Sequence, residues 1–194
     1  METLLNGMLS KMGDKGIEKI AQSAGMDAGI AKTLLQQAGP LLTAKMADKA
    51  KDKHELAGLE KALQDHDGSV FDHIDDVANP DVDTKGSKIL GHILGENTGD
   101  LVRVLSSKND ADSGSVGKLL EMAAPLVLGQ LGSKKSDSGL DSAGLLDLLK
   151  KEKNAAFSDD GLLMDLATQF LDTDGDGSIV DDVLGMAGKF FNKK

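Results

Sequence analysis

The chain has 194 residues, of which 40% are hydrophobic and 28% charged, so it can bury a core as one domain or two small ones. Its net charge of −10 repels phosphate backbones and argues against general nucleic-acid binding. The lack of cysteine excludes disulfides, thiolate metal sites and cysteine nucleophiles. Aromatic residues make up only 3%, without Trp or Tyr, so the predicted core is aliphatic.

The N-terminal segment predicts no export and no membrane anchoring. It has no basic region and no cleavage-site pattern, and its apolar run is short. No stretch of the sequence reaches the apolar length of a membrane span. We therefore expect a cytoplasmic protein with no integral membrane segment and no nucleic-acid partner.

Apolar residues recur at helical spacing along almost the whole sequence. The first helix is expected around residues 4–12, where Leu5, Met8, Leu9 and Met12 share one face. The pattern continues through residues 17–21, 31–38 and 41–46. No segment shows the strict alternation that strands need, so the fold class is predicted to be all-α.

Helix ends are predicted at prolines and at polar segments. Pro40 and Pro125 each mark the end of one helix and the start of the next. Polar, Gly/Ser/Asp-rich loops are expected at residues 79–87, 106–115, 132–142 and 153–160. The first of these predicts a boundary between an N-terminal helical half, residues 1–84, and a C-terminal helical half, residues 85–194, which ends in an Asp-rich loop and a helix.

Three matches in the same order along the chain indicate an internal duplication. Residues 34–42 match 119–127, residues 57–59 match 143–145, and residues 65–72 match 174–181. The offset grows from 85 to 109, which implies roughly one extra helix in the second copy. We expect a multihelical array of two similar halves packed together.

The strongest motif for function is an aspartate-rich loop near the C-terminus. It begins as an EF-hand loop does, with carboxylates at positions 1, 3 and 5 and Gly177 at position 6. A hard cation needs six or more oxygen ligands, and alternating Asp residues in a tight turn can supply three of them. The predicted calcium ligands are Asp172, Asp174 and Asp176, the carbonyl of Ser178, and Asp181 or Asp182 as the closing carboxylate.

This loop departs from the EF-hand at its last position. Position 12 is Val183 instead of a bidentate Glu, so we expect weak calcium binding, with a dissociation constant of about 10⁻⁵ to 10⁻³ M. The alternative is a helix cap without metal, in which Ser178 and Asp181 form a capping box. The two interpretations are compatible.

A second acidic loop covers residues 65–72, but Leu63 stands where the first calcium ligand would be. Ser69 and Asp72 keep the spacing of a capping box, and a capped, solvated turn is the favoured interpretation. A degenerate calcium site is one alternative. Another is a transition-metal site that uses His66 and His73 with neighbouring carboxylates.

Two other features admit a structural and a functional interpretation. His92, within Gly91-His92-Ile93-Leu94-Gly95, is expected to pack between helices with its ring hydrogen-bonded, and the alternative is a catalytic role. The Met- and Phe-rich segments 1–12 and 186–191 are expected to be core faces, and the alternative is a surface that receives a partner helix.

Three motifs together resemble the bacterial YidB-like family, a domain of unknown function. They are the Gly91–Gly95 segment, in which members often have Phe in place of Leu94; residues 124–132 (APLVLGQLG); and the Asp-rich turn at residues 174–182, present in weaker form at 65–73. The resemblance spans about residues 31–183 and implies an all-helical fold. It implies no activity.

The leading interpretation is a non-enzymatic, calcium-binding interaction or scaffold protein with another protein as its partner. The alternative is a helical peptide- or lipid-binding module with an apolar groove, in which the Asp loop is only a helix cap. An enzyme would need a pocket that collects His92 or His66 with carboxylates, which the spacing does not indicate.

Overall fold

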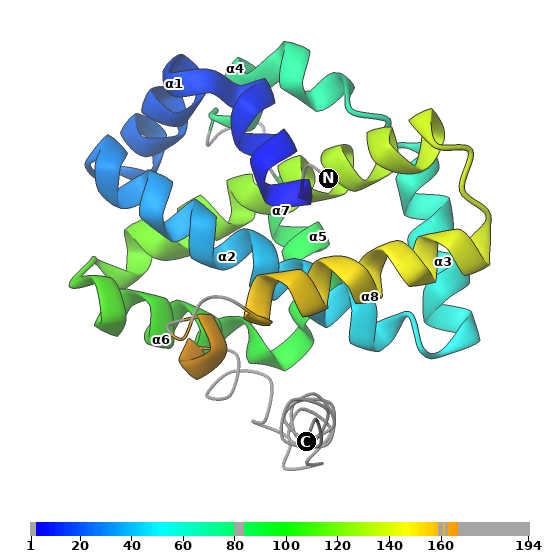
Figure 1. The fold of residues 1–194 in the computed structure, drawn as a ribbon. Helices are drawn as coiled ribbons and strands as arrows, with labels where there is room; N and C mark the ends of the chain where they lie inside the picture. The colour runs from blue at the N-terminus through cyan, green and yellow to red at the C-terminus, as the bar shows by residue number, and fades with distance from the viewer. Residues whose placement is uncertain (1–2, 80–83, 159–160, 162, 167–194) are drawn as a thin grey trace, which may run out of the picture.

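The computed structural model describes residues 3–79, 84–158, 161 and 163–166. Over these residues the chain forms helices and no strands, which confirms the all-α fold class (Figure 1). The elements are α1 (Leu4–Ala24), α2 (Ala28–Lys49), α3 (Lys53–Gln64), the 3-10 helix η1 (Ser69–His73), α4 (Ile74–Val77), α5 (Thr84–Leu94), the 3-10 helix η2 (Gly95–Asn97), α6 (Thr98–Asn109), α7 (Ser113–Asp137) and α8 (Ser142–Ser158).

Aspartate residues begin several of the long helices. Asp27, Asp52 and Asp112 are the N-caps of α2, α3 and α7. Asp27 and Asp52 each accept two hydrogen bonds from backbone N–H groups of the first turn, and Asp112 accepts one. Those N–H groups have no partner within the helix, so a short acidic side chain is well suited to the cap position. Some of the acidic residues of the chain therefore have a structural role as helix N-caps.

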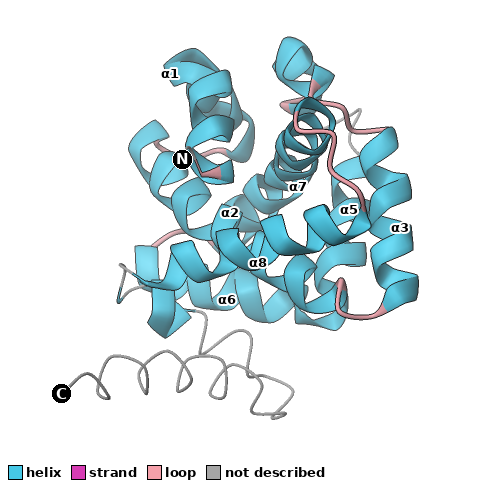
Figure 2. Cartoon of the chain, turned by 45° about the vertical axis from the view of Figure 1, so that its right-hand side comes forward, coloured by secondary structure: helices cyan, strands magenta, loops and turns pink. Residues whose placement is uncertain are grey.

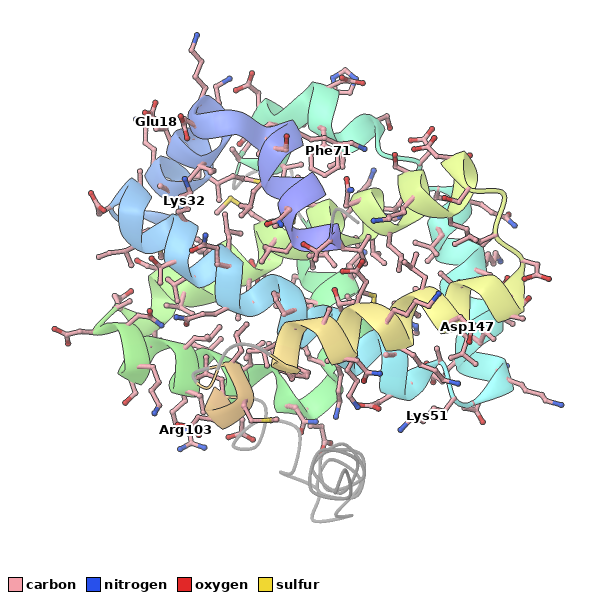
Figure 3. All side chains as sticks on the ribbon, in the orientation of Figure 1. Glu18, Lys32, Lys51, Phe71, Arg103 and Asp147 are labelled. Carbon is pink, nitrogen blue, oxygen red and sulfur yellow. The ribbon has the colours of Figure 1, made fainter. Side chains whose placement is uncertain are left out.

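Helix α7 is the centre of the fold, and α1, α2, α3, α5, α6 and η1 all pack against it (Figure 1). The buried hydrophobic side chains of the described residues are Leu, Ile, Val, Ala and Met, so the predicted aliphatic core is confirmed. Charged side chains such as Glu18, Lys32 and Arg103 point outward (Figure 3). Core packing around one long helix therefore fixes the positions of the others.

The helix breaks predicted at the two prolines are wrong. Pro40 lies inside α2 and Pro125 inside α7, and both helices continue through them. A proline inside a helix costs roughly 3 kcal/mol, because it removes one hydrogen bond and crowds the preceding turn. Both prolines are buried, as are their neighbours on either side, so we attribute the continuity to burial of apolar surface along both helices.

Most of the predicted polar loops are helix ends. Helix α7 extends to Asp137 and α8 to Ser158, so the loops expected at 132–142 and 153–160 are largely helical. The loop expected at 106–115 shortens to the residues between α6 and α7. Residues 34–42 and 119–127, which match in sequence, lie in two proline-containing helices that pack together, but the internal duplication and the boundary at residue 84 stay predictions.

None of the helices in the described part of the chain combines the length and the apolar character needed to cross a membrane.

Candidate functional site

The larger of two mainly apolar cavities among the described residues is a groove between α3 and α5. Both helices pack on α7 but make little contact with each other, and they lie toward the same side of the molecule (Figure 2). The gap encloses a cavity of about 220 Å³. We call it the α3–α5 groove. Its apolar lining is Met46, Ala50, Leu59, Ala62, Ile89, Ile93 and Leu128, and its polar lining is Lys49, Glu55, His66, Lys88 and His92.

Two glycines on α7 bring the loop after α3 close to the groove. A Cβ atom on Gly132 would lie 2.9 Å from the carbonyl carbon of His66 and closer still to its oxygen. A Cβ atom on Gly129 would lie 2.5 Å from a methyl group of Val70. The loop that carries His66 therefore rests directly on the helix backbone, and side chains at these two positions would push it away.

The loop itself is a tight turn held by Asp67. The backbone N–H of Ser69 donates to Asp67 Oδ1 at 3.0 Å, and this bond holds the pKa of the Asp67 carboxyl below its ordinary value. Gly68 has a φ of 101°, a left-handed conformation that favours glycine. The expected capping box of Ser69 and Asp72 is wrong. The N-cap residue of η1 is Gly68, which has no side chain to accept a hydrogen bond, and Asp67 accepts the backbone N–H of Ser69 instead.

His66 faces the groove from this turn. Its Nδ1 lies 2.8 Å from the carbonyl oxygen of Ala62, one helical turn earlier, so a proton on Nδ1 donates to that oxygen. This assignment leaves Nε2 as the other polar atom of the ring. The turn and the end of α3 together set the orientation of the imidazole at the groove.

The other rim groups come from α2, α3 and α5. Lys49 Nζ donates to the backbone oxygen of His92 at 2.6 Å and pairs with Glu55 at 3.2 Å, which links the three helices at one end of the groove. Lys88 and His92 are one turn apart on α5, and both are exposed. The expectation that His92 packs between helices is therefore wrong, because the side chain lies at the rim of the groove.

The calcium ligands predicted from the sequence lie outside the described residues. These are Asp172, Asp174, Asp176, Ser178, Asp181 and Asp182. Within the described residues, no three His, Asp or Glu side chains come close enough together to hold a metal ion. The metal alternatives for the loop at residues 65–72, including the one with His66 and His73, stay predictions.

A second, smaller cavity of about 110 Å³ lies where the start of α1 meets α2, α7 and α8. It contains Gln130, which is 7% exposed and whose Oε1 atom has no hydrogen-bond partner among the described residues. Glu152, also in its lining, accepts the backbone N–H of Leu4 at 2.8 Å and so caps α1. Its polar groups thus include a structural cap, which makes it the weaker candidate for a ligand site.

Sequence patterns did not indicate the groove. Its lining comes from four separate parts of the chain, and each contributes only one to four residues. One usable signal was present: Ile89 and Ile93 lie four residues apart, as do Lys88 and His92 beside them, which places an apolar pair and a polar pair on adjoining strips of α5. Each strip alone is equally typical of an ordinary surface helix.

Over the described residues, the protein is all-helical and carries an apolar groove with a polar rim. Residues 6–134 match a family described as bacterial protein of unknown function (DUF937), and the chain belongs to this family. The match contains α2 to α6 and nearly all of α7, so it covers every residue that lines the groove. The resemblance to a bacterial family of unknown function is confirmed. No curated protein and no solved structure matches the chain.

Proposed function

We propose that the protein is a non-enzymatic helical binding module whose α3–α5 groove holds the aliphatic chain of a small lipid-like ligand. The observation that carries the proposal is the groove, an almost wholly apolar cavity of about 220 Å³ open to the surface. Ligand sites are typically concave and apolar, with a few polar groups that orient the ligand. Leu59, Ile89 and Leu128 would supply the apolar contacts.

The size of the cavity favours a small ligand. An apolar cavity of about 150 Å³ in another protein is large enough to bind benzene, so this groove has room for a short alkyl chain. Its lining is aliphatic, which suits a flexible chain that adapts to the shape of the cavity. Each methylene group transferred from water into the groove should contribute about 0.8 kcal/mol, or roughly a fourfold gain in affinity.

The surface around the groove favours such a chain over a partner helix. A docked amphipathic helix buries a long stripe of apolar side chains on its partner. Among the described residues, Ile30 is the only large hydrophobic side chain classed as exposed, at 37%, and it does not line the groove. A groove without exposed large hydrophobic side chains around it suits a chain that enters the cavity better than a helix that lies across the surface.

The test is a titration of the ¹⁵N-labelled full chain with hexanol, heptanol and octanol, followed by NMR. The expected result is saturable shifts at groove residues and a roughly fourfold gain in affinity per added methylene. Shifts that never saturate, or an affinity independent of chain length, would overturn the proposal.

Two alanines on α3 provide a matched pair of variants. Ala62 lines the groove, whereas Ala57 is exposed on the same helix and does not line it. Ala62→Leu should fill part of the cavity and weaken octanol binding at least fivefold, while Ala57→Leu should leave it within twofold. Equal effects of the two substitutions would show that octanol binds elsewhere.

We propose calcium binding as a second function, carried by the spacing of the aspartates in residues 172–182. Calorimetric titration with calcium should give saturable heat for the wild-type chain and none for Asp174→Ala, with magnesium as the control. The absence of heat at several millimolar calcium would leave the segment as a helix cap. This outcome is independent of the groove, because a calcium site there would need none of the groove residues.

A further inference from the structure

The rim of the groove carries more information about the ligand than the apolar lining does. It contains two lysines, two histidines and one glutamate. Glu55 pairs with Lys49, so the only carboxylate of this rim already has a cationic partner. Lys88 is exposed, and no acidic side chain of the described residues lies within ion-pair distance of it.

This arrangement runs against the charge of the whole chain. The net charge is −10, so the average surface repels anions. At the mouth of the groove, the ammonium group of Lys88, which has no acidic partner among the described residues, stands next to an apolar cavity, with the ring of His92 one turn further along the same helix. An anionic group held there would meet a positive charge and a ring N–H donor, while a cationic group would meet Lys88 directly.

We propose, building on the proposed function, that the ligand of the α3–α5 groove is a medium-chain fatty acid, with its carboxylate at Lys88 and His92 and its alkyl chain on the aliphatic lining. The single charge of a carboxylate matches the single charge of Lys88, the rim lysine that has no acidic partner in the described part of the chain. A phosphate monoester carries about −1.5 to −2 charges near neutral pH and would leave excess negative charge close to Glu55. The carboxylate is therefore the better match.

The positions of the polar groups support this orientation. Lys88 and His92 form a strip of α5 next to the strip of Ile89 and Ile93, and all four residues line the groove, so the head and the chain of one molecule can contact one helix. Lys49 already donates to the backbone oxygen of His92 and pairs with Glu55, so it links α2 to α5 and α3. The carboxylate of the ligand is therefore expected to bind Lys88 and His92 and not Lys49.

The experiment compares octanoate, octanol, octyl phosphate and octyltrimethylammonium as probes of the full chain by NMR titration. The key variant is Lys88→Glu. Its matched control is Lys85→Glu, an exposed lysine in the first part of the same helix that does not line the groove, so the net charge changes equally. Helical content of both variants is checked by circular dichroism.

The expected result is that Lys88→Glu weakens octanoate binding about tenfold, because reversing the charge replaces an attraction by a repulsion of similar size. Octanol binding should change less than twofold, and Lys85→Glu should change octanoate binding less than threefold. Octyltrimethylammonium should bind the wild-type chain more weakly than octanol does and should gain affinity in Lys88→Glu.

Other outcomes overturn the proposal in distinguishable ways. Saturable octanol binding without Lys88-dependent octanoate binding would refute the fatty-acid assignment and leave the alkyl-binding groove intact. Tighter, Lys88-dependent binding of octyl phosphate would assign the site to a phosphate ester. Displacement of octanoate by an acidic amphipathic peptide that binds more tightly would assign it to a protein partner. Failure of octanol and octanoate alike to bind would refute the proposed function together with this inference.

Discussion

Replacing Gly132 by alanine should destabilise the protein and disturb the groove at the same time. The new Cβ atom would lie 2.9 Å from the carbonyl carbon of His66, closer to its oxygen, and 3.2 Å from the carbonyl oxygen of Leu63. Real Cβ atoms essentially never approach other atoms within 3.0 Å, and the atoms in the way here are backbone. The end of α3 and the following loop must therefore move.

The magnitude follows from two opposing effects. Overpacking of this kind costs typically about 1–3 kcal/mol, occasionally more. Alanine in place of glycine within a helix contributes about 0.5–1 kcal/mol in the other direction. Since the obstacle is rigid, the upper part of the first range applies, and we expect a net loss of about 2 kcal/mol in the free energy of unfolding.

Gly117 offers a matched control on the same helix, because a Cβ atom there would meet nothing within 4 Å. Gly117→Ala should therefore raise stability by about 0.5–1 kcal/mol, opposite in sign to Gly132→Ala. Urea denaturation followed by circular dichroism measures both. A Gly132→Ala protein as stable as the wild type, with unchanged NMR shifts at His66, would refute the close approach of the loop to α7.

Three further predictions concern buried and hydrogen-bonded polar groups. Gln130→Met removes a buried amide oxygen that has no partner among the described residues, so the free energy of unfolding should rise by about 1 kcal/mol in urea denaturation; a fall would show that the amide has a bound partner. Asp48→Asn weakens the bonds of 2.8 and 3.0 Å from the largely buried Lys153 to Asp48, which join α8 to α2, and should cost about 1–3 kcal/mol by the same assay. Backbone hydrogen bonds lower the pKa of Asp67 and Asp112 in the folded state, so their contribution to stability is complete above the ordinary carboxyl pKa of 3.8 and is lost as the pH falls through the lowered values. The urea midpoint of Asp67→Asn should therefore fall less than that of the wild type on acidification through this range, and parallel curves would contradict the assignment.

The sequence allowed prediction of the helical class and the aliphatic core because both depend on pattern and composition. Helical spacing of apolar residues and the absence of alternation were sufficient for the first. The scarcity of aromatic residues was sufficient for the second. Neither the helical class nor the aliphatic composition of the core depends on which helices pack against each other.

Local preference alone does not predict the helices at the prolines and polar segments, because tertiary packing outweighs it there. Pro40 and Pro125 disfavour a helix locally, but each lies among buried residues of a long helix, where packing outweighs the local cost. Likewise, the Gly- and Ser-containing end of α7 looks like a loop in sequence. In the structure Gly132 is where the backbone of the loop after α3 contacts the helix.

The groove could not be predicted because it results from tertiary packing. Met46, Leu59, Ile93 and Leu128 are typical core residues in their own helices, and they line a cavity only because α3 and α5 are held apart on α7. His92 drew attention in the sequence, but only the packing of α5 shows that its side chain lies at the rim. The opposite applies to the aspartates of residues 172–182, whose interpretation depends on sequence spacing alone.

The most direct test of the central claim is an isotope-filtered NOE measurement on the full chain with bound octanol. We predict intermolecular NOEs from the terminal methyl group of the ligand to the methyl groups of Leu59, Ile89 and Ile93. NOEs to Leu5 and Val127, which line the smaller cavity, or none from a demonstrably bound ligand to the groove, would contradict the account.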